Sequence, residues 1–192
     1  MNYRNIFSAA VLAFSLLYGS NSAWADQVGD QQLITQAKSA VFQSIDKDTN
    51  LGHAMQNWSS CKQTIGGHDP WAVEESGGEK YVTFTCWNQN AESFGRAVKS
   101  AQKVTGENYL DIQNLGEEFV FKIGNNVSFT GGLTIWEWKD GKSFAAQMNW
   151  DAAVKNLKNA YEDKPIIDIN DPDSINLLLT GTEAFYPQRK RN

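Results

Sequence analysis

The sequence has few residues suited to catalysis or metal binding, and it lacks the short motifs that mark common enzyme classes. Its 192 residues include only two His and two Cys. No GxSxG, HExxH, phosphate-loop or GxGxxG pattern occurs in it. Any imidazole chemistry would have to use His53 or His68. We therefore lean towards a non-catalytic protein and expect neither a cofactor nor a metal.

The sequence also has no surplus of basic residues and no long apolar run. Its 17 Lys and Arg stand against 22 Asp and Glu, so the formal net charge is -5. This balance argues against nucleic acid as the main partner. The apolar run Ile6 to Leu17 is far shorter than the roughly 20 residues that a bilayer-spanning helix requires. We expect no integral membrane segment after processing.

The first 25 residues have the pattern of a signal peptide. Arg4 provides a positive start, Ile6 to Leu17 is apolar, and Ala23-Trp24-Ala25 fits a cleavage site. We expect the mature protein to begin at Asp26 and to be periplasmic or secreted.

The two cysteines are predicted to form a disulfide. Exported proteins meet an oxidising environment, where a pair such as Cys61 and Cys86 is oxidised by default. The spacing between them is not the CxxC spacing of a metal or redox pair.

One polar loop begins like a calcium site. Asp46, Asp48 and Asn50 have the spacing of the first ligands of such a loop, but Leu51 and Asn57 stand where the sharp-turn glycine and the chelating glutamate are required. We interpret the segment as a polar loop between helices, with Thr49 capping the second helix.

Strands dominate the middle of the chain. In the segment Lys80 to Trp87, apolar side chains alternate with polar or amphipathic ones, which places Val82, Phe84 and Cys86 on one face of a strand. The alternation elsewhere predicts strands at 71–75, 109–115, 117–123, 129–138 and 142–148, with a bulge or close approach at Gly131 and Gly132 and turns at 76–79 and at Asp140-Gly141.

Helical periodicity flanks these strands. It predicts helices from Asp30 to Ser44, from Thr49 to Trp58, from Ala91 to Val104, and from Asn149 or Asp151 to Pro165. We expect one α+β domain at 26–164: an antiparallel sheet of four to six strands with helices packed on one face, cystatin-like or lysozyme-inhibitor-like in outline. Residues 165–192 are expected to form a loosely packed extension that ends in the basic tail Arg189-Lys-Arg191.

Several segments together resemble a diffuse group of small exported bacterial proteins of uncharacterised function. These are Thr49 to Trp58, Trp71, Gly78-Glu-Lys-Tyr-Val-Thr-Phe84, Phe119-Val-Phe121 and Trp136-Glu-Trp-Lys-Asp-Gly-Lys-Ser-Phe144. The resemblance covers about Thr49 to Trp150. It implies a short helix, a Gly-bounded strand and an aromatic hairpin, and it assigns no functional residue.

Candidate binding residues are mainly aromatic. Tyr81 and Trp87 share the half-polar face of their strand, Trp136 and Trp138 share a face of another, and His68 lies in a turn beside Asp69. We expect a periplasmic or secreted protein that binds another macromolecule, either an envelope component or a secreted enzyme. The alternatives are a hydrolase that uses His68 and nearby carboxylates, or a small-ligand carrier with an aromatic pocket near Trp136. The sequence leaves the oligomeric state open.

Overall fold

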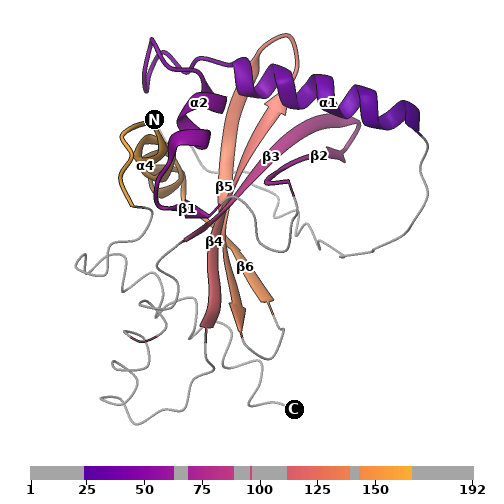
Figure 1. Ribbon diagram of the computed structural model, residues 1–192. Coiled ribbons are helices and arrows are strands. Elements are labelled where there is room, and N and C mark those ends of the chain that lie inside the picture. The colour runs from indigo at the N-terminus through magenta and orange to yellow at the C-terminus, as the bar shows by residue number, and fades with distance from the viewer. Residues whose placement is uncertain (1–23, 63–68, 89–95, 97–111, 139–142, 166–192) are drawn as a thin grey trace, which may run out of the picture.

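In its described residues the chain forms a six-stranded antiparallel sheet and three helices, shown in Figure 1. The computed structural model describes residues 24–62, 69–88, 96, 112–138 and 143–165. The helices are α1 (Trp24–Ser39), α2 (Leu51–Asn57) and α4 (Trp150–Tyr161), and the strands are β1 (Cys61–Lys62), β2 (Trp71–Ser76), β3 (Glu79–Asn88), β4 (Ile112–Ile123), β5 (Val127–Trp138) and β6 (Ser143–Gln147). This architecture agrees with the predicted α+β class and strand number.

The sheet is built as a run of antiparallel neighbours. Strands β3, β4, β5 and β6 lie side by side in that order, while β2 and β1 pair with different parts of β3. The β2–β3 hairpin was predicted and is present. Its turn residues Gly77 and Gly78 both have positive φ values, of 63° and 78°, which glycine adopts readily.

A bulge interrupts the pairing of β4 with β5, as predicted from the paired glycines. The register shifts between Val120 and Phe121, and the facing Gly131 has a φ of 138°. Beside it, a side chain on Gly132 would come within 2.6 Å of the Glu118 carbonyl oxygen. Both glycines are therefore required by the backbone geometry.

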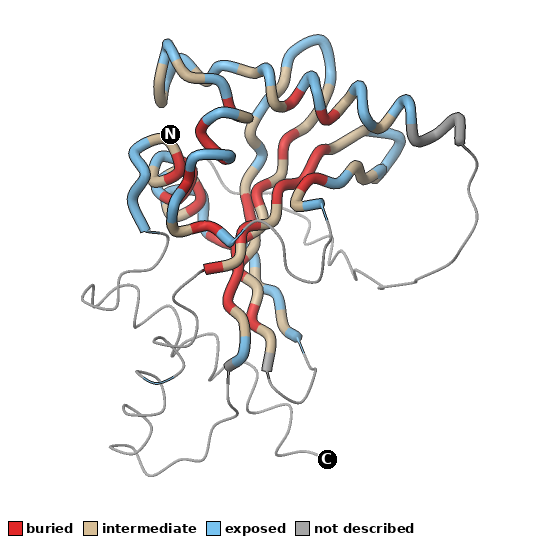
Figure 2. The backbone as a smooth tube through the Cα atoms, in the orientation of Figure 1, coloured by how far each residue is buried: buried red, intermediate tan, exposed pale blue. Residues whose placement is uncertain are grey.

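Alternation along the strands divides the sheet into two faces. We call one the core face, whose positions include Val82, Phe84 and Cys86 of β3 together with Leu115, Glu117, Phe119 and Phe121 of β4; all seven side chains are 0% exposed. Residues just after two of the helices meet this face: Phe42, which follows α1, packs on Phe121, and Trp58, which follows α2, packs on Phe119. Figure 2 shows the buried positions concentrated along the middle strands.

The first helix begins and ends earlier than its periodicity predicted. α1 ends at Ser39, and Val41, expected in its apolar stripe, is 44% exposed. After the helix the chain turns, and the amides of Ile45 and Asp46 donate to the Phe42 carbonyl. Phe42 and Ile45, on either side of this turn, pack against the hydrophobic core.

The predicted cap of α2 is wrong by one residue. Asn50, not Thr49, is the N-cap, because its side-chain oxygen accepts from the His53 amide at 2.8 Å. The Thr49 hydroxyl instead donates to the Asp46 carboxylate, which also accepts from the amides of Asp48 and Thr49. These bonds lower the pKa of Asp46 and use its carboxylate to stabilise a turn.

Of the two caps considered for α4, Asn149 is the one observed, since its side chain accepts from the Ala152 amide. The helix ends at Tyr161, before Pro165, and Asp163 then adopts a positive φ of 50°. The predicted helix 91–104 and the Asp140-Gly141 turn lie outside the described residues, apart from Arg96. None of the described helices has the length and apolar character that crossing a membrane requires.

Candidate functional site

The disulfide joins the end of the α2 segment to the core face of β3. Cys61 and Cys86 are bonded, with their Cα atoms 5.3 Å apart. Cys61 lies in β1, which pairs with the end of β3 and was not predicted from the sequence. A disulfide is compatible with an extracellular or periplasmic location.

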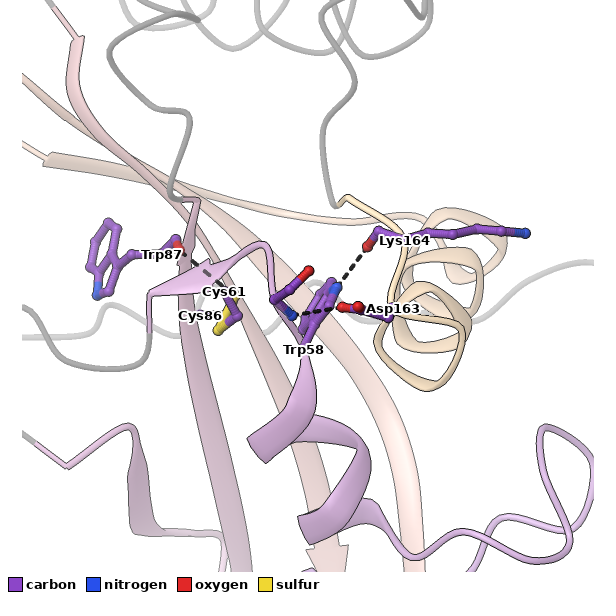
Figure 3. The surroundings of a disulfide bond; sticks show 7 residues. Trp58, Cys61, Cys86, Trp87, Asp163 and Lys164 are labelled. Atoms are coloured by element: carbon purple, nitrogen blue, oxygen red, sulfur yellow. Dashed lines mark hydrogen bonds between the residues drawn. A yellow bond between two sulfur atoms is a disulfide. The ribbon is translucent and has the colours of Figure 1, made fainter.

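Two hydrogen bonds beside the disulfide connect the α2 segment to the end of α4, as Figure 3 shows. The Trp58 indole Nε1 donates to the Lys164 carbonyl at 2.6 Å, and the Ser59 amide donates to the Asp163 carboxylate at 2.7 Å. The second bond lowers the pKa of Asp163. The disulfide therefore fixes the segment of Trp58 and Ser59, and this segment is hydrogen-bonded to the end of α4.

The other side of the sheet, which we call the outer face, carries the residues that alternate with the core positions. In β3 these are Tyr81, Thr83, Thr85 and Trp87, and in β4 they are Gly116, Glu118, Val120 and Lys122; Leu133 and Ile135 of β5 continue the face. Apart from the buried Thr83 and Gly116, these positions are half-buried. The outer face thus combines aromatic, aliphatic and acidic groups on a rigid sheet.

Trp87 covers a glycine of this face. It pairs with Gly116 across the β3–β4 ladder, and Ile135 pairs with Gly116 from the other side. A Cβ atom on Gly116 would lie only 2.6 Å from Trp87 Cε3, so the indole ring lies directly over the glycine. In Figure 3 the Trp87 side chain points away from the disulfide and from Trp58.

Replacing Gly116 by alanine should displace the Trp87 ring. The new methyl group would also meet the Cys86 carbonyl oxygen at 3.0 Å, so neither ring nor backbone accommodates it without a shift. We expect the free energy of unfolding to fall by about 1–3 kcal/mol and the near-UV circular dichroism to change. The control is Gly29→Ala in α1, where an added Cβ has no neighbour within 4 Å. An unchanged near-UV spectrum in Gly116→Ala would contradict this geometry.

Two carboxyl groups on the outer face have raised pKa values. Glu118 pairs with Thr85, whose hydroxyl donates to it at 3.3 Å. Burial, with a smaller contribution from the charge of Glu74 on β2, raises the pKa of Glu118 to about 7. Burial also raises the pKa of Glu74. Glu118 therefore changes its charge near neutral pH.

Tyr81 belongs to a small polar network at the β2–β3 end of the face. Its hydroxyl donates to the Glu79 carboxylate at 2.9 Å, and Lys122 forms an ion pair with the same carboxylate. The hydrogen bond to Glu79 raises the pKa of Tyr81. The positive charge of Lys122 is thus compensated within the network.

The other candidate residues lie elsewhere. Trp136 is on the core face, 1% exposed, and packs on Phe144. It is therefore a core residue here and does not line the outer face. The side chain of Trp138 and the whole of His68 lie outside the described residues. The predicted aromatic candidates that the structure brings to one face are Tyr81 and Trp87.

A buried carboxyl group on the core face was missed by the sequence reasoning. Glu117 is 0% exposed, and its Oε1 accepts from the Asn156 side chain of α4 at 2.6 Å. Its Oε2 has no hydrogen-bond partner among the described residues. Burial raises the pKa of Glu117 well above its usual range, although the bond from Asn156 opposes this. Alternation with Phe119 and Phe121 placed Glu117 on the buried face, and that signal was available in the sequence.

A shallow groove follows α4. It has a volume of about 470 Å³, and its lining includes Trp150, Val154, Lys158 and Glu162. Trp150, 56% exposed, packs against Phe129 with the two rings tilted by 34°. Within the described ranges no cluster of three His, Cys, Asp or Glu residues is placed to hold a metal ion.

Comparison with protein families, with curated proteins and with solved structures finds no significant match to this chain.

Proposed function

We propose that this is a non-catalytic periplasmic or secreted protein that binds another macromolecule through the outer face of its sheet. In this proposal the helices occupy one face, as in a cystatin-like or lysozyme-inhibitor-like outline, and leave the other for a partner. The partner is an envelope component or a secreted enzyme. The observation that carries the proposal is Trp87, whose half-buried indole lies over Gly116 on the face opposite the hydrophobic core.

The composition of the outer face supports this role. Tryptophan and tyrosine are enriched at the energetically dominant positions of interfaces, because each buries a large rigid surface with little loss of conformational freedom. Leu133 and Ile135 extend the apolar surface next to Trp87, while Glu118 and Tyr81 provide polar groups around it.

The rigidity of β3 also supports a binding role for the outer face. The strand carrying Trp87 pairs with β1, β2 and β4 and is joined to Cys61 by the disulfide. A binding residue that is already fixed in position loses little entropy when a partner docks. The disulfide next to Trp87 therefore serves recognition as well as stability.

Affinity capture with matched tryptophan variants tests the proposal. Tagged wild-type protein, Trp87→Ala and Trp150→Ala are each incubated with envelope extract and with the secreted fraction of the source cells. We expect at least one component to be retained by the wild type and by Trp150→Ala, and retention by Trp87→Ala to fall about tenfold or more, as for a central interface residue. Trp150→Ala is the control because it removes a more exposed indole from α4.

Two results would contradict the proposal. One is equal retention of every component by Trp87→Ala and the wild type, when circular dichroism shows both to be folded. The other is measurable turnover of a cell-wall or peptide substrate by a protein that retains no partner.

A further inference from the structure

We propose, resting on the binding role above, that the partner presents a cationic protein segment whose Lys or Arg side chain lies between Trp87 and Glu118.

The first support is the charge of the outer face. Among the described residues it carries the carboxyl groups of Glu74, Glu118 and Glu137. Of its lysines, Lys122 is paired with Glu79, while the exposed Lys62 of β1 pairs with Trp87 across the β1–β3 ladder. The face is therefore acidic, in a chain whose formal net charge is -5. A cationic segment is the partner whose charge complements it.

The second support is the placement of Trp87 and Glu118. Trp87 pairs with Gly116 and Thr85 pairs with Glu118, so Trp87 and Glu118 are diagonal neighbours across adjacent strands. Aromatic and long side chains at diagonal positions are close enough to contact the same bound group. A cation on the indole face would thus be close to the carboxylate, which combines a cation–π contact with a charge-assisted hydrogen bond.

The chain already contains a contact of the first kind. Lys38 of α1 places its Nζ atom 5.2 Å from the ring centroid of Trp71. This intramolecular pair shows the geometry that the partner's side chain would reproduce on Trp87, with the added carboxylate of Glu118.

Binding should depend on pH because Glu118 must be ionised to attract a cation. The groups that face it are Thr85 on β3, Glu74 on β2 and the uncharged Leu133 on β5. Lys122 on its own strand is held by Glu79, and Lys62 of β1 lies on the far side of Trp87 from Glu118. With the pKa of Glu118 at about 7, its ionised fraction increases about tenfold between about pH 6 and about pH 8. The affinity should rise by a similar factor.

Selection from a phage-displayed library of random peptides tests the inference. The library is selected on the full-length wild-type protein and depleted on Trp87→Ala. Enriched peptides are then synthesised and titrated against the wild type, Glu118→Gln and Asp48→Asn. Asp48→Asn is the matched control, because it removes the same unit charge from an exposed loop. The Asp48 carboxylate makes only a long contact there, 4.0 Å from Lys47 Nζ.

We expect the Trp87-dependent peptides to carry Lys or Arg and a net positive charge. Glu118→Gln should weaken their binding about tenfold and abolish its rise between about pH 6 and about pH 8, while Asp48→Asn should change it by less than about twofold. Equal weakening by Asp48→Asn and Glu118→Gln would overturn the inference, since binding would then follow net charge alone.

Other outcomes separate this inference from the proposed function. Trp87-dependent peptides that are neutral or acidic would overturn the cationic partner and leave the outer face as the binding surface. Peptides enriched only after Arg189, Lys190 and Arg191 are changed to Gln would show that the chain's own tail is the occupant, and would overturn an external cationic partner. Absence of any Trp87-dependent peptide from all selections would overturn the binding role of the face itself.

Discussion

Replacing both Cys61 and Cys86 by alanine is expected to lower the free energy of unfolding by about 3–4 kcal/mol, the value for closing a loop of this length in the chain-entropy model. The bond spans a sequence separation of 25 residues and ends at a fully buried core position. Its loss also releases the segment that carries Trp58 and Ser59. The hydrogen bonds of these residues to Lys164 and Asp163 should weaken with it.

Chemical denaturation followed by tryptophan fluorescence measures this effect. A reductant should shift the denaturation midpoint of the wild type towards that of the double alanine variant and should leave the variant unchanged. Hydrogen exchange should show the largest loss of protection at the C-terminal end of α4. A wild type whose midpoint is insensitive to the reductant would contradict a stabilising role for the disulfide.

Glu117→Gln is expected to stabilise the protein increasingly as the pH rises. In the native state burial keeps Glu117 protonated well above the pKa of about 4.3 that it has when unfolded. Above that pH the native state binds one more proton than the unfolded state, so Glu117 lowers the free energy of unfolding by about 1.4 kcal/mol per pH unit until its native pKa is reached. Glutamine removes this slope and still accepts from Asn156.

Unfolding curves of the wild type and Glu117→Gln between about pH 4 and about pH 8 test this prediction. The difference in stability should be small near pH 4 and should grow with pH. Glu118→Gln is the comparison, because the pKa of Glu118 is about 7 and the corresponding gain should level off above that pH. A Glu117→Gln variant less stable than the wild type by the same amount at every pH would show that Glu117 is charged in the native protein.

The sequence predicted most of the strands because alternation is a local signal. Val82, Phe84 and Cys86 were assigned to one face of β3 and are all fully buried. The β2–β3 turn was also predictable, since two adjacent glycines between strands favour positive φ values at both positions. These features depend on residues close together in the chain.

Features that depend on tertiary contacts were harder to predict. Nothing local shows that the chain turns after Ser39 so that Phe42 packs on Phe121, nor that Cys61 begins a strand beside the end of β3. The cap of α2 was misplaced because Thr49 and Asn50 are both good caps, and the carboxylate of Asp46 takes the hydroxyl of Thr49.

The candidate site was predicted in part. Alternation alone assigned Tyr81 and Trp87 to the face opposite the core residues of β3. It did not show that Trp87 lies over Gly116, because that contact requires the β3–β4 register. For the same reason Glu118 was not identified, since its surroundings come from Thr85 and Glu74 on two other strands.

An equilibrium titration of the captured partner against the wild type, Trp87→Ala and Trp150→Ala measures directly whether the outer face binds it. If the outer face is the binding surface, the Kd should rise about tenfold or more for Trp87→Ala and stay within about twofold of the wild type for Trp150→Ala. A Kd unchanged by Trp87→Ala in a folded variant, or raised only by Trp150→Ala, would show that the binding surface lies elsewhere.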